Sequence, residues 1–389
     1  MSQPAAVDDH DDIIYPATLP FVLVHLVCLG AIWTGVNAGV VTLAVALYVV
    51  RMFGVTAGYH RYFSHRTFRT SRVGQFLLAL LAQSSAQRGI LWWAAKHRHH
   101  HRYSDLIEDV HSPRQHGFWY AHLGWVFRPR HAATDHAMVP DLARYPELRF
   151  LDRHQYFPAT VLAVAVWLAA GWPGLVVGFF WSTVALYHGT FMINSLAHVH
   201  GTQRYVTGDD SRNNWWLALV TLGEGWHNNH HAYQRSTRQG FRWWEVDPTY
   251  YVLKALSWTG AVRDLGAPPP DVVRNEHRLG RAVIEKVARE LAATFSPEQL
   301  AHDVRAAWAA SPHLRDLGNR VRTARDQMST WAAGAHLPNL PTLEDLRARA
   351  EEMYAQTPSM DEIVARAREV LTERVSLLVL QMESAPATA

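Results

Sequence analysis

Four stretches of the sequence are apolar and long enough to cross a lipid bilayer, and they come as two pairs. A helix rises about 1.5 Å per residue, so roughly 17 to 25 apolar residues are needed for one crossing. The turn within each pair is short and uncharged. We therefore predict two transmembrane helical hairpins, which cover Leu19 to Val36 with Ala38 to Gly58, and Tyr156 to Gly171 with Gly174 to Ala197.

Buried helices of a large soluble core are the alternative explanation of these stretches. A helix at the edge of such a core alternates apolar and polar faces, whereas Val161 to Ala170 has no polar face. The mean hydropathy of the whole chain is only -0.12, so a large polar portion accompanies the apolar stretches. The sequence therefore predicts an all-α protein in which four transmembrane helices carry a helical cap.

The segment between the hairpins, Arg51 to Arg153, is rich in Lys and Arg, whereas the turns within the hairpins contain none. The positive-inside rule places such a segment in the cytoplasm, and both termini with it. The residues before Pro20 contain no Lys or Arg, so we expect the first apolar stretch to be retained as a transmembrane helix. Gly74 to Ala95 is apolar only in part, and we predict that it lies at the membrane interface.

From about Val272 onward the chain is rich in Ala, Arg, Glu and Leu at helical spacing, with N-cap signals at Ser296, Thr342 and Ser359. We predict three parts: a polar tail over residues 1–18, a membrane domain over 19–270, and a soluble helical extension over 271–389. The extension has no catalytic constellation, and we expect it to act in packing or oligomerisation.

Composition excludes several classes of protein. Cys28 is the only cysteine, which rules out an internal disulfide framework and any metal site with several thiolates. The net charge is +3 and the basic residues are dispersed, so nucleic acid is not an expected partner. The sequence pI of about 9.0 instead suits contact with anionic membrane lipid.

Histidine is the unusual residue of this chain, because most of its 24 copies lie between His60 and His231. Residues three or four apart share one helix face, and neutral imidazole binds transition metals. The predicted topology puts all the histidine motifs on one side of the membrane, where they can converge. They read His60-x4-His65, His97-x-His99-His100-His101, Asn194-x3-His198 and His227-x2-His230-His231.

Nine imidazoles at these spacings are too many for one ion, so the pattern predicts a site with two metal ions. Imidazole alone is compatible with zinc, copper, nickel or iron. The single cysteine disfavours a structural zinc site, no His-Glu-x-x-His motif exists, and only Glu224 to His227 matches the Glu-x-x-His motif of ferritin-like proteins. The membrane setting favours iron.

These motifs, in this order relative to two hairpins, resemble those of the membrane acyl-CoA and acyl-lipid desaturases of the stearoyl-CoA desaturase type. The surrounding sequence resembles the same family. The resemblance covers roughly residues 20 to 265 and leaves out the extension, which is similar to an addition in some bacterial members. The matching segments are Thr56 to His60, Asp109 to Pro113, Phe118 to Trp125 and Glu224 to His227.

The resemblance implies a multi-pass enzyme, in the inner membrane of a bacterium, with a cytoplasmic di-iron site. Such an enzyme uses O2 to insert a cis double bond, by default at position 9, into a long-chain acyl-CoA or acyl-lipid. A fatty acid or alkane hydroxylase on the same scaffold is the alternative. The family's iron ligands correspond to His60, His65, His97, His100, His101, His198, His227, His230 and His231, and Asn194 corresponds to a residue that holds a water on one iron.

Several residues near the motifs have less certain assignments. His99 is an extra histidine in the second motif, and it either replaces a neighbour or is no ligand. Asp105, Asp109 and Glu224 are candidates to accept the second N–H of a ligand. The remaining histidines, such as His122 and His188, are expected at the surface or behind the ligands.

The two electrons of the reaction need a source. Nothing in the sequence resembles a fused cytochrome b5, flavin or ferredoxin domain, because there is no Rossmann glycine motif and no set of cysteines. We therefore expect a separate electron donor of the ferredoxin, cytochrome b5 or flavin reductase type. Tyr48, twelve residues before His60, is a candidate for the end wall of the acyl channel, although a packing or lipid-facing role is favoured.

Overall fold

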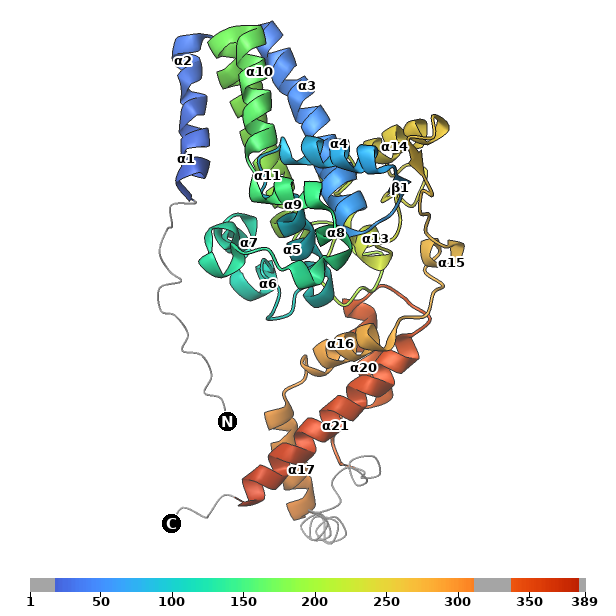
Figure 1. The fold of residues 1–389 in the computed structure, drawn as a ribbon. Helices are drawn as coiled ribbons and strands as arrows, with labels where there is room; N and C mark the ends of the chain where they lie inside the picture. Colours follow the sequence, from blue (N-terminus) through green and yellow to red (C-terminus); the bar gives the residue numbers. More distant parts are fainter. Residues whose placement is uncertain (1–17, 311–336, 385–389) are drawn as a thin grey trace. The chain divides into compact units, whose positions relative to one another are not determined.

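The structure is a computed structural model that describes residues 18–310 and 337–384, and it is almost wholly helical (Figure 1). The only sheet among these residues joins two short antiparallel strands, β1 (Arg69–Thr70) and β2 (Val262–Arg263). The chain forms two compact units: the first contains the described residues up to Arg204 and Asp209–Val273, and the second contains Tyr205–Gly208 and the described residues from Arg274 onward. The predicted helical class is confirmed.

The first hairpin turns at Gly35, whose φ of 81° is a conformation that glycine adopts without strain. The side chain of Asn37 then caps the next helix by accepting the N–H of Val40 at 3.1 Å. The hairpin consists of α1 (Thr18–Val27), η2 (Cys28–Gly30) and α2 (Ala31–Thr34), followed by α3 (Ala38–Phe53) and the π-helix η3 (Gly54–Ser64).

The second hairpin also turns at a glycine. Gly171 has a φ of 65°, and Pro173 follows it, so the helix breaks there and the chain doubles back. Ala159 and Val166 before the turn consequently pack against Phe179 after it. The helices are α10 (Phe157–Pro173), η7 (Gly174–Trp181), α11 (Ser182–Ser195) and η8 (Leu196–His198), and α10 lies beside η7 (Figure 1).

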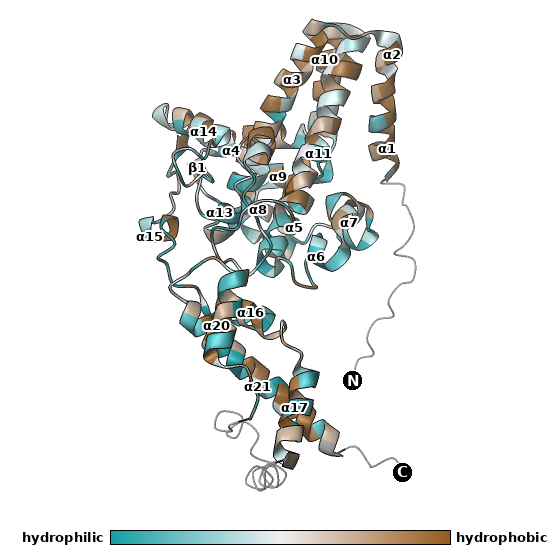
Figure 2. Ribbon diagram, turned by 180° about the vertical axis from the view of Figure 1, so that it is seen from behind, coloured by the Kyte–Doolittle hydropathy of each residue, from teal (hydrophilic) through white to brown (hydrophobic). Residues whose placement is uncertain are grey.

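Two helical stretches of the described residues, Ala38–Ser64 and Phe157–His198, are long and apolar enough to cross a membrane, and the latter contains the Gly171 turn. Only 33% and 28% of their most apolar windows are buried, so most of this apolar surface faces outward, unlike that of a soluble core helix. Thr18–Thr34 is apolar but shorter. Apolar residues gather on these helices in Figure 2. Four crossings, and their orientation, remain a prediction.

The helical cap comes from the chain between the hairpins and after the second one. The polar residues that interrupt the Gly74 to Ala95 stretch end α4 at Gln83, and α5 begins at Ile90, whose N–H is accepted by the Gln83 side chain at 3.0 Å. The cap helices are α4 (Arg72–Gln83), α5 (Ile90–Tyr103), α6 (Pro113–His116), α7 (Phe118–His122), η4 (Gly124–Phe127), η5 (Pro129–His131), η6 (His136–Met138), α8 (Pro140–Ala143), α9 (Pro146–Arg153), α12 (Trp215–Val220), α13 (His227–Ala232), α14 (Pro248–Trp258) and α15 (Pro270–Val273).

The second unit is a set of helices around its own apolar core, in which Val287, Leu291 and Ile363 are fully buried. Thr342 forms a capping box with Asp345 at the start of α20, as the sequence predicts. Its helices of more than one turn are α16 (Arg281–Ala292), α17 (Pro297–Ala310), α20 (Leu343–Met353) and α21 (Met360–Ser384).

Candidate metal centre

The nine motif histidines form two groups in which the ligand atoms lie within 4.8 Å of one another. Members of both groups come from helices far apart in the sequence. All nine rings are buried or half-buried. We call them cluster A (His60, His65, His97, His101 and His230) and cluster B (His100, His198, His227 and His231).

The two His-x-x-His-His motifs divide their histidines between the clusters in opposite senses. His97 and His101 are four apart on α5 and join cluster A, while His100 joins cluster B. On α13, His227 and His231 are four apart and join cluster B, while His230 joins cluster A. Adjacent helical residues point about 100° apart, so each motif reaches both clusters. Two ion sites therefore share two helices.

The spacing of His60 and His65 is explained by the π-helix η3. In a π-helix the N–H of one residue bonds to the carbonyl five residues earlier, so residues five apart lie over one another. The N–H of His65 donates to the His60 carbonyl at 3.2 Å, and the two ring centres are 4.8 Å apart. An α-helix would turn these side chains away from each other. Both rings therefore reach cluster A.

The Nε2 atoms of cluster A are spaced as the ligands of one ion. Neighbouring Nε2 atoms lie 2.9 to 3.1 Å apart, and His97 Nε2 faces both His65 and His101. A ring nitrogen has one proton or one lone pair, so hydrogen bonds cannot satisfy both contacts. With metal–nitrogen bonds of roughly 2.1 Å, ligands at 90° are about 3.0 Å apart, whereas tetrahedral ligands are about 3.4 Å apart. The donor set fits an ion with five or six ligands.

Carboxylates stand behind several of the ligands and orient them by accepting their Nδ1–H. In cluster B, His198 donates to Asp105 at 2.9 Å, His100 donates to Asp109 at 3.0 Å, and His231 donates to Asp209 at 2.8 Å. In cluster A, His60 contacts Glu224 at 2.5 Å. Such contacts turn Nε2 toward the metal. The predictions for Asp105, Asp109 and Glu224 therefore agree with the geometry, while Asp209 was not predicted.

Electrostatics keeps the rings in the form that binds metal. Burial, reinforced by the neighbouring imidazoles, holds the pKa values of His97, His101 and His230 well below their usual range, so these rings are neutral at physiological pH. Burial alone would raise the pKa of Asp209, but the charge and hydrogen bond of His231 keep it low. His97, His101 and His230 are thus neutral in cluster A, and Asp209 is ionised beside His231 in cluster B.

His99 does not join either cluster. Its Nε2 lies 2.8 Å from the Glu108 carbonyl, on the outer side of α5. His111, in contrast, lies with His100 and Asp109 in a further group of buried potential ligand atoms. The sequence analysis did not single out His111 as a ligand, although His111 lies in the Asp109 to Pro113 segment that resembles the family.

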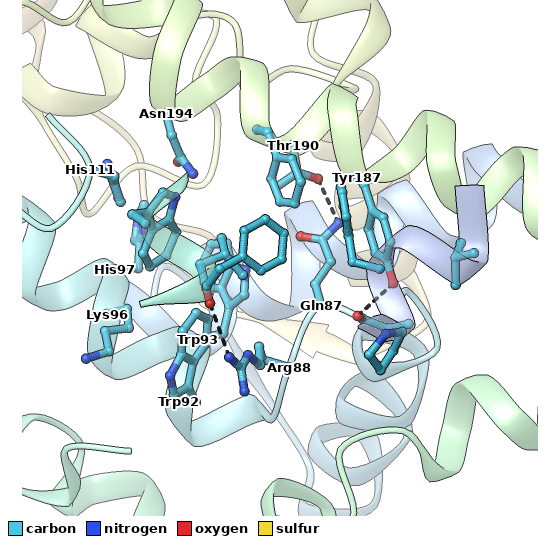
Figure 3. A pocket seen from close by; sticks show the side chains of 18 of the residues that line it. Gln87, Arg88, Trp92, Trp93, Lys96, His97, His111, Tyr187, Thr190 and Asn194 are labelled. Atoms are coloured by element: carbon cyan, nitrogen blue, oxygen red, sulfur yellow. Dashed lines mark hydrogen bonds between the residues drawn. The ribbon is translucent and has the colours of Figure 1, made fainter. Parts of the chain in front are cut away.

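A cavity with an open side adjoins the centre, and its empty space, including the part open to solvent, is about 1060 Å³. Figure 3 shows His97, His111 and Asn194 together at one side of it and Tyr187 toward the other. Aromatic and apolar side chains from α1, α5, η4 and α11 make up most of its wall. Asn194 therefore lies where the cavity meets the histidines.

Polar and charged side chains lie at two places in the cavity wall. Gln87 donates to the Thr190 hydroxyl at 3.0 Å in the cavity wall, and Arg88 and Lys96 add positive charge beside the tryptophans of α5 (Figure 3). Tyr48, the candidate end wall, is not among the lining residues, because its hydroxyl donates to the Val220 carbonyl at 2.7 Å.

Three more histidines form a row in the first unit that the sequence did not predict. His25 Nε2 lies 3.1 Å from His188 Nε2, and His188 Nδ1 lies 3.0 Å from His122 Nε2. The outer ends of the row contact the Phe21 carbonyl at 2.8 Å and the Ser195 hydroxyl at 3.0 Å. His122 is therefore buried and His188 half-buried, and both lie outside clusters A and B.

Comparison with known proteins also assigns most of the first unit to a desaturase family. The model of the family described as fatty acid desaturase matches residues 36–261. An acyl-CoA 5-desaturase of Anemone leveillei is 36% identical over 248 residues, which are 63% of this chain and 77% of that protein. An sn-1 stearoyl-lipid 9-desaturase of Synechocystis is 35% identical over 264 residues, 66% of this chain and 81% of that protein.

A palmitoyl-monogalactosyldiacylglycerol delta-7 desaturase of Arabidopsis thaliana is also similar, with 38% identity over 237 residues, which are 60% of this chain and 63% of that protein. The named relatives act at different positions of the acyl chain and on different acyl carriers. The match stops before the helices of the second unit.

Proposed function

This chain belongs to the fatty acid desaturase family and is an oxidoreductase of the lipid desaturase type, and from that premise we propose that its nine clustered histidines hold two iron ions. The observation that carries the proposal is the convergence of two imidazole sets, one of five and one of four, beside a single apolar cavity. When bound, the irons supply the oxidising power to remove hydrogen from an unactivated methylene, which no side chain can do by itself.

The residues of this chain have three tasks in that reaction. The histidines of clusters A and B hold the two ions, and the carboxylates behind them keep the rings in one orientation. Asn194, at the end of the cavity nearest the histidines, would hold a water on one of the two ions. The apolar wall excludes other water from the reacting carbons.

The cavity is the proposed site of the acyl chain. Its apolar wall suits a hydrocarbon, and the Gln87–Thr190 hydrogen bond marks a polar point in that wall. Arg88 and Lys96 place positive charge where an anionic carrier group can bind. The substrate is therefore a long-chain acyl group on CoA or on a membrane lipid, in line with the substrates named for the relatives.

We assign the double bond to position 9 in the cis configuration, since several similar proteins are named 9-desaturases. The overall reaction consumes O2, two electrons and two protons, and it forms one double bond and two waters. The electrons come from a separate donor of the ferredoxin, cytochrome b5 or flavin reductase type. The site and both termini face the cytoplasm of a bacterial inner membrane, because the cap carries most of the positive charge near the apolar helices.

A hydroxylase on the same scaffold is the second candidate, because both reactions begin with removal of hydrogen from a methylene. The family of the chain favours desaturation. Mass spectrometry of the acyl products distinguishes the two, since desaturation removes two hydrogens and hydroxylation adds one oxygen.

The decisive experiment is expression of the full chain in a bacterial host that cannot make unsaturated fatty acids. We expect new monounsaturated acids, and derivatisation of the double bond gives its position. His230→Ala is the matched inactive control, and His99→Ala is the matched active one. Hydroxy acids would support the second candidate, and saturated acids alone, with iron bound and an electron donor supplied, would contradict both.

A further inference from the structure

The carboxylates around cluster B are numerous and held in place. Three of its four histidines donate Nδ1–H to an aspartate, and Asp105 and Asp109 are each only 1% exposed. Asp105 also accepts the Ser112 hydroxyl at 2.6 Å and the Asp210 N–H at 2.8 Å, and Asp109 accepts the Asp105 N–H at 2.9 Å. These bonds fix three negative charges directly behind the ligands.

Fewer carboxylates contact the histidines of cluster A. Its only histidine–carboxylate contact among the described residues joins His60 to Glu224, and Glu224 also accepts two N–H groups of the buried Arg61 at 3.1 Å. The Nδ1 atoms of His101 and His230 have no hydrogen-bond partner in the described part of the chain. Arg61 also contacts the buried Asp247 at 2.9 Å, so Glu224 shares this guanidinium with a second carboxylate, and two ligands lack any acceptor. Cluster A thus has one carboxylate in contact with its ligands, whereas cluster B has three.

This difference acts on a bound ion in two ways. An imidazole that donates to a carboxylate carries more electron density on its other nitrogen and binds a metal more strongly. Fixed negative charge in a buried site also favours the higher charge state of a nearby ion, because the local dielectric is low. All nine protein ligands are imidazoles. A difference in ligand type therefore cannot offset the difference in negative charge between the two clusters.

We propose that Asp105, Asp109 and Asp209 make the two metal sites unequal: the ion in cluster B binds more tightly and is reduced second, after the ion in cluster A. With iron bound, the residues of cluster A would hold the ion that takes up the first electron from the external donor, and those of cluster B the ion that takes up the second. The aspartates are positioning residues that act through His198, His100 and His231. This inference rests on the proposed di-iron function.

The test is a stepwise reductive titration of the full-length protein loaded with 57Fe and followed by Mössbauer spectroscopy. We expect two ferric signals, one of which becomes ferrous before the other. Asp209→Asn keeps the shape of the side chain but removes its charge, so the two reduction steps should move closer together. Glu224→Gln, the matched variant behind cluster A, should leave the later step unchanged.

Release of iron to a chelator gives a second measurement that does not depend on activity. The wild-type protein should release one ion quickly and one slowly, and Asp105→Asn or Asp209→Asn should speed the slow phase about 10- to 100-fold. Simultaneous reduction of both ions, or equal acceleration of both phases in the variants, would contradict the inference and leave the di-iron site intact. A wild-type protein that cannot hold two irons would overturn both proposals.

Discussion

The first unit contains two groups of histidines that lie on different helices and differ in how their ring nitrogens are used. In the metal centre, the Nε2 atoms of His60, His97 and His230 turn inward toward their neighbours in cluster A. In the row of His25, His188 and His122, the rings join end to end, and both nitrogens of each ring already have a partner.

The difference shows what makes a histidine cluster a metal site. Convergence of one nitrogen from each ring, with carboxylates behind some of the rings, leaves lone pairs directed at a common point. The row has no such point, because His188 uses a different nitrogen for each neighbour. His25, at one end of the row, lies on α1. The row therefore connects α1 to His188 on α11 and His122 on α7, beside the cavity. Four substitutions or treatments test this contrast.

The largest effect is expected from His230→Ala. His230 lies within 3.1 Å of two other cluster A ligands, so its loss removes a central ligand. Desaturation should fall by more than about 100-fold, beyond the effect usual for groups behind a ligand, and bound iron should drop from two ions to one or none. His188→Ala should keep both ions, which elemental analysis of purified protein can determine. Loss of iron in both variants would erase the distinction between the groups.

Removal of the metal should destabilise the first unit and spare the second. Each ion binds only the folded site, so it contributes about 4 kcal/mol when its concentration is a thousand times its dissociation constant. Hydrogen exchange of the chelated protein should therefore rise in α5 and α13. Exchange in α16 and α21, whose core contains no histidine ligand, is the internal control. Unchanged protection of α5 and α13 would contradict a structural contribution of the ions.

A smaller effect is expected in the row from His25→Leu. The substitution removes two hydrogen bonds and leaves His188 Nε2 without its partner, which costs about 1 to 3 kcal/mol of stability. Thermal unfolding in lipid nanodiscs measures the loss, and iron content should stay at two ions. Leu26→Ala, at an outward-facing position of the same helix, is the matched control. Equal stability of the two variants would show that the row does not secure α1.

The smallest effect is expected from His99→Ala, because His99 contacts the Glu108 carbonyl and the Tyr103 ring rather than a member of either cluster. Activity should stay within about twofold of wild type, in the range of an ordinary surface change. The adjacent substitution His100→Ala removes a cluster B ligand and should abolish activity. A strong loss of iron in His99→Ala would instead return this residue to the set of ligands.

The sequence by itself determined the features that depend on local spacing and composition. Apolar runs interrupted near Asn37 and Trp172 predicted the helical hairpins, because a helix that faces lipid needs an unbroken apolar surface. The intervals of three and four in the histidine motifs indicated shared helix faces, and the structure gathers these residues into two clusters. The single cysteine excluded thiolate ligands.

Only the tertiary structure decided how these residues are combined. The division of the motifs between clusters depends on how α5, α13 and η3 face one another, and spacing within one helix carries no information about that. The contact of Asp209 with His231, and that of His25 with His188, join positions 22 and 163 residues apart. Such contacts arise when packing brings distant side chains together, so local sequence could reveal the candidate ligands and the neighbouring carboxylates but not Asp209 or the row.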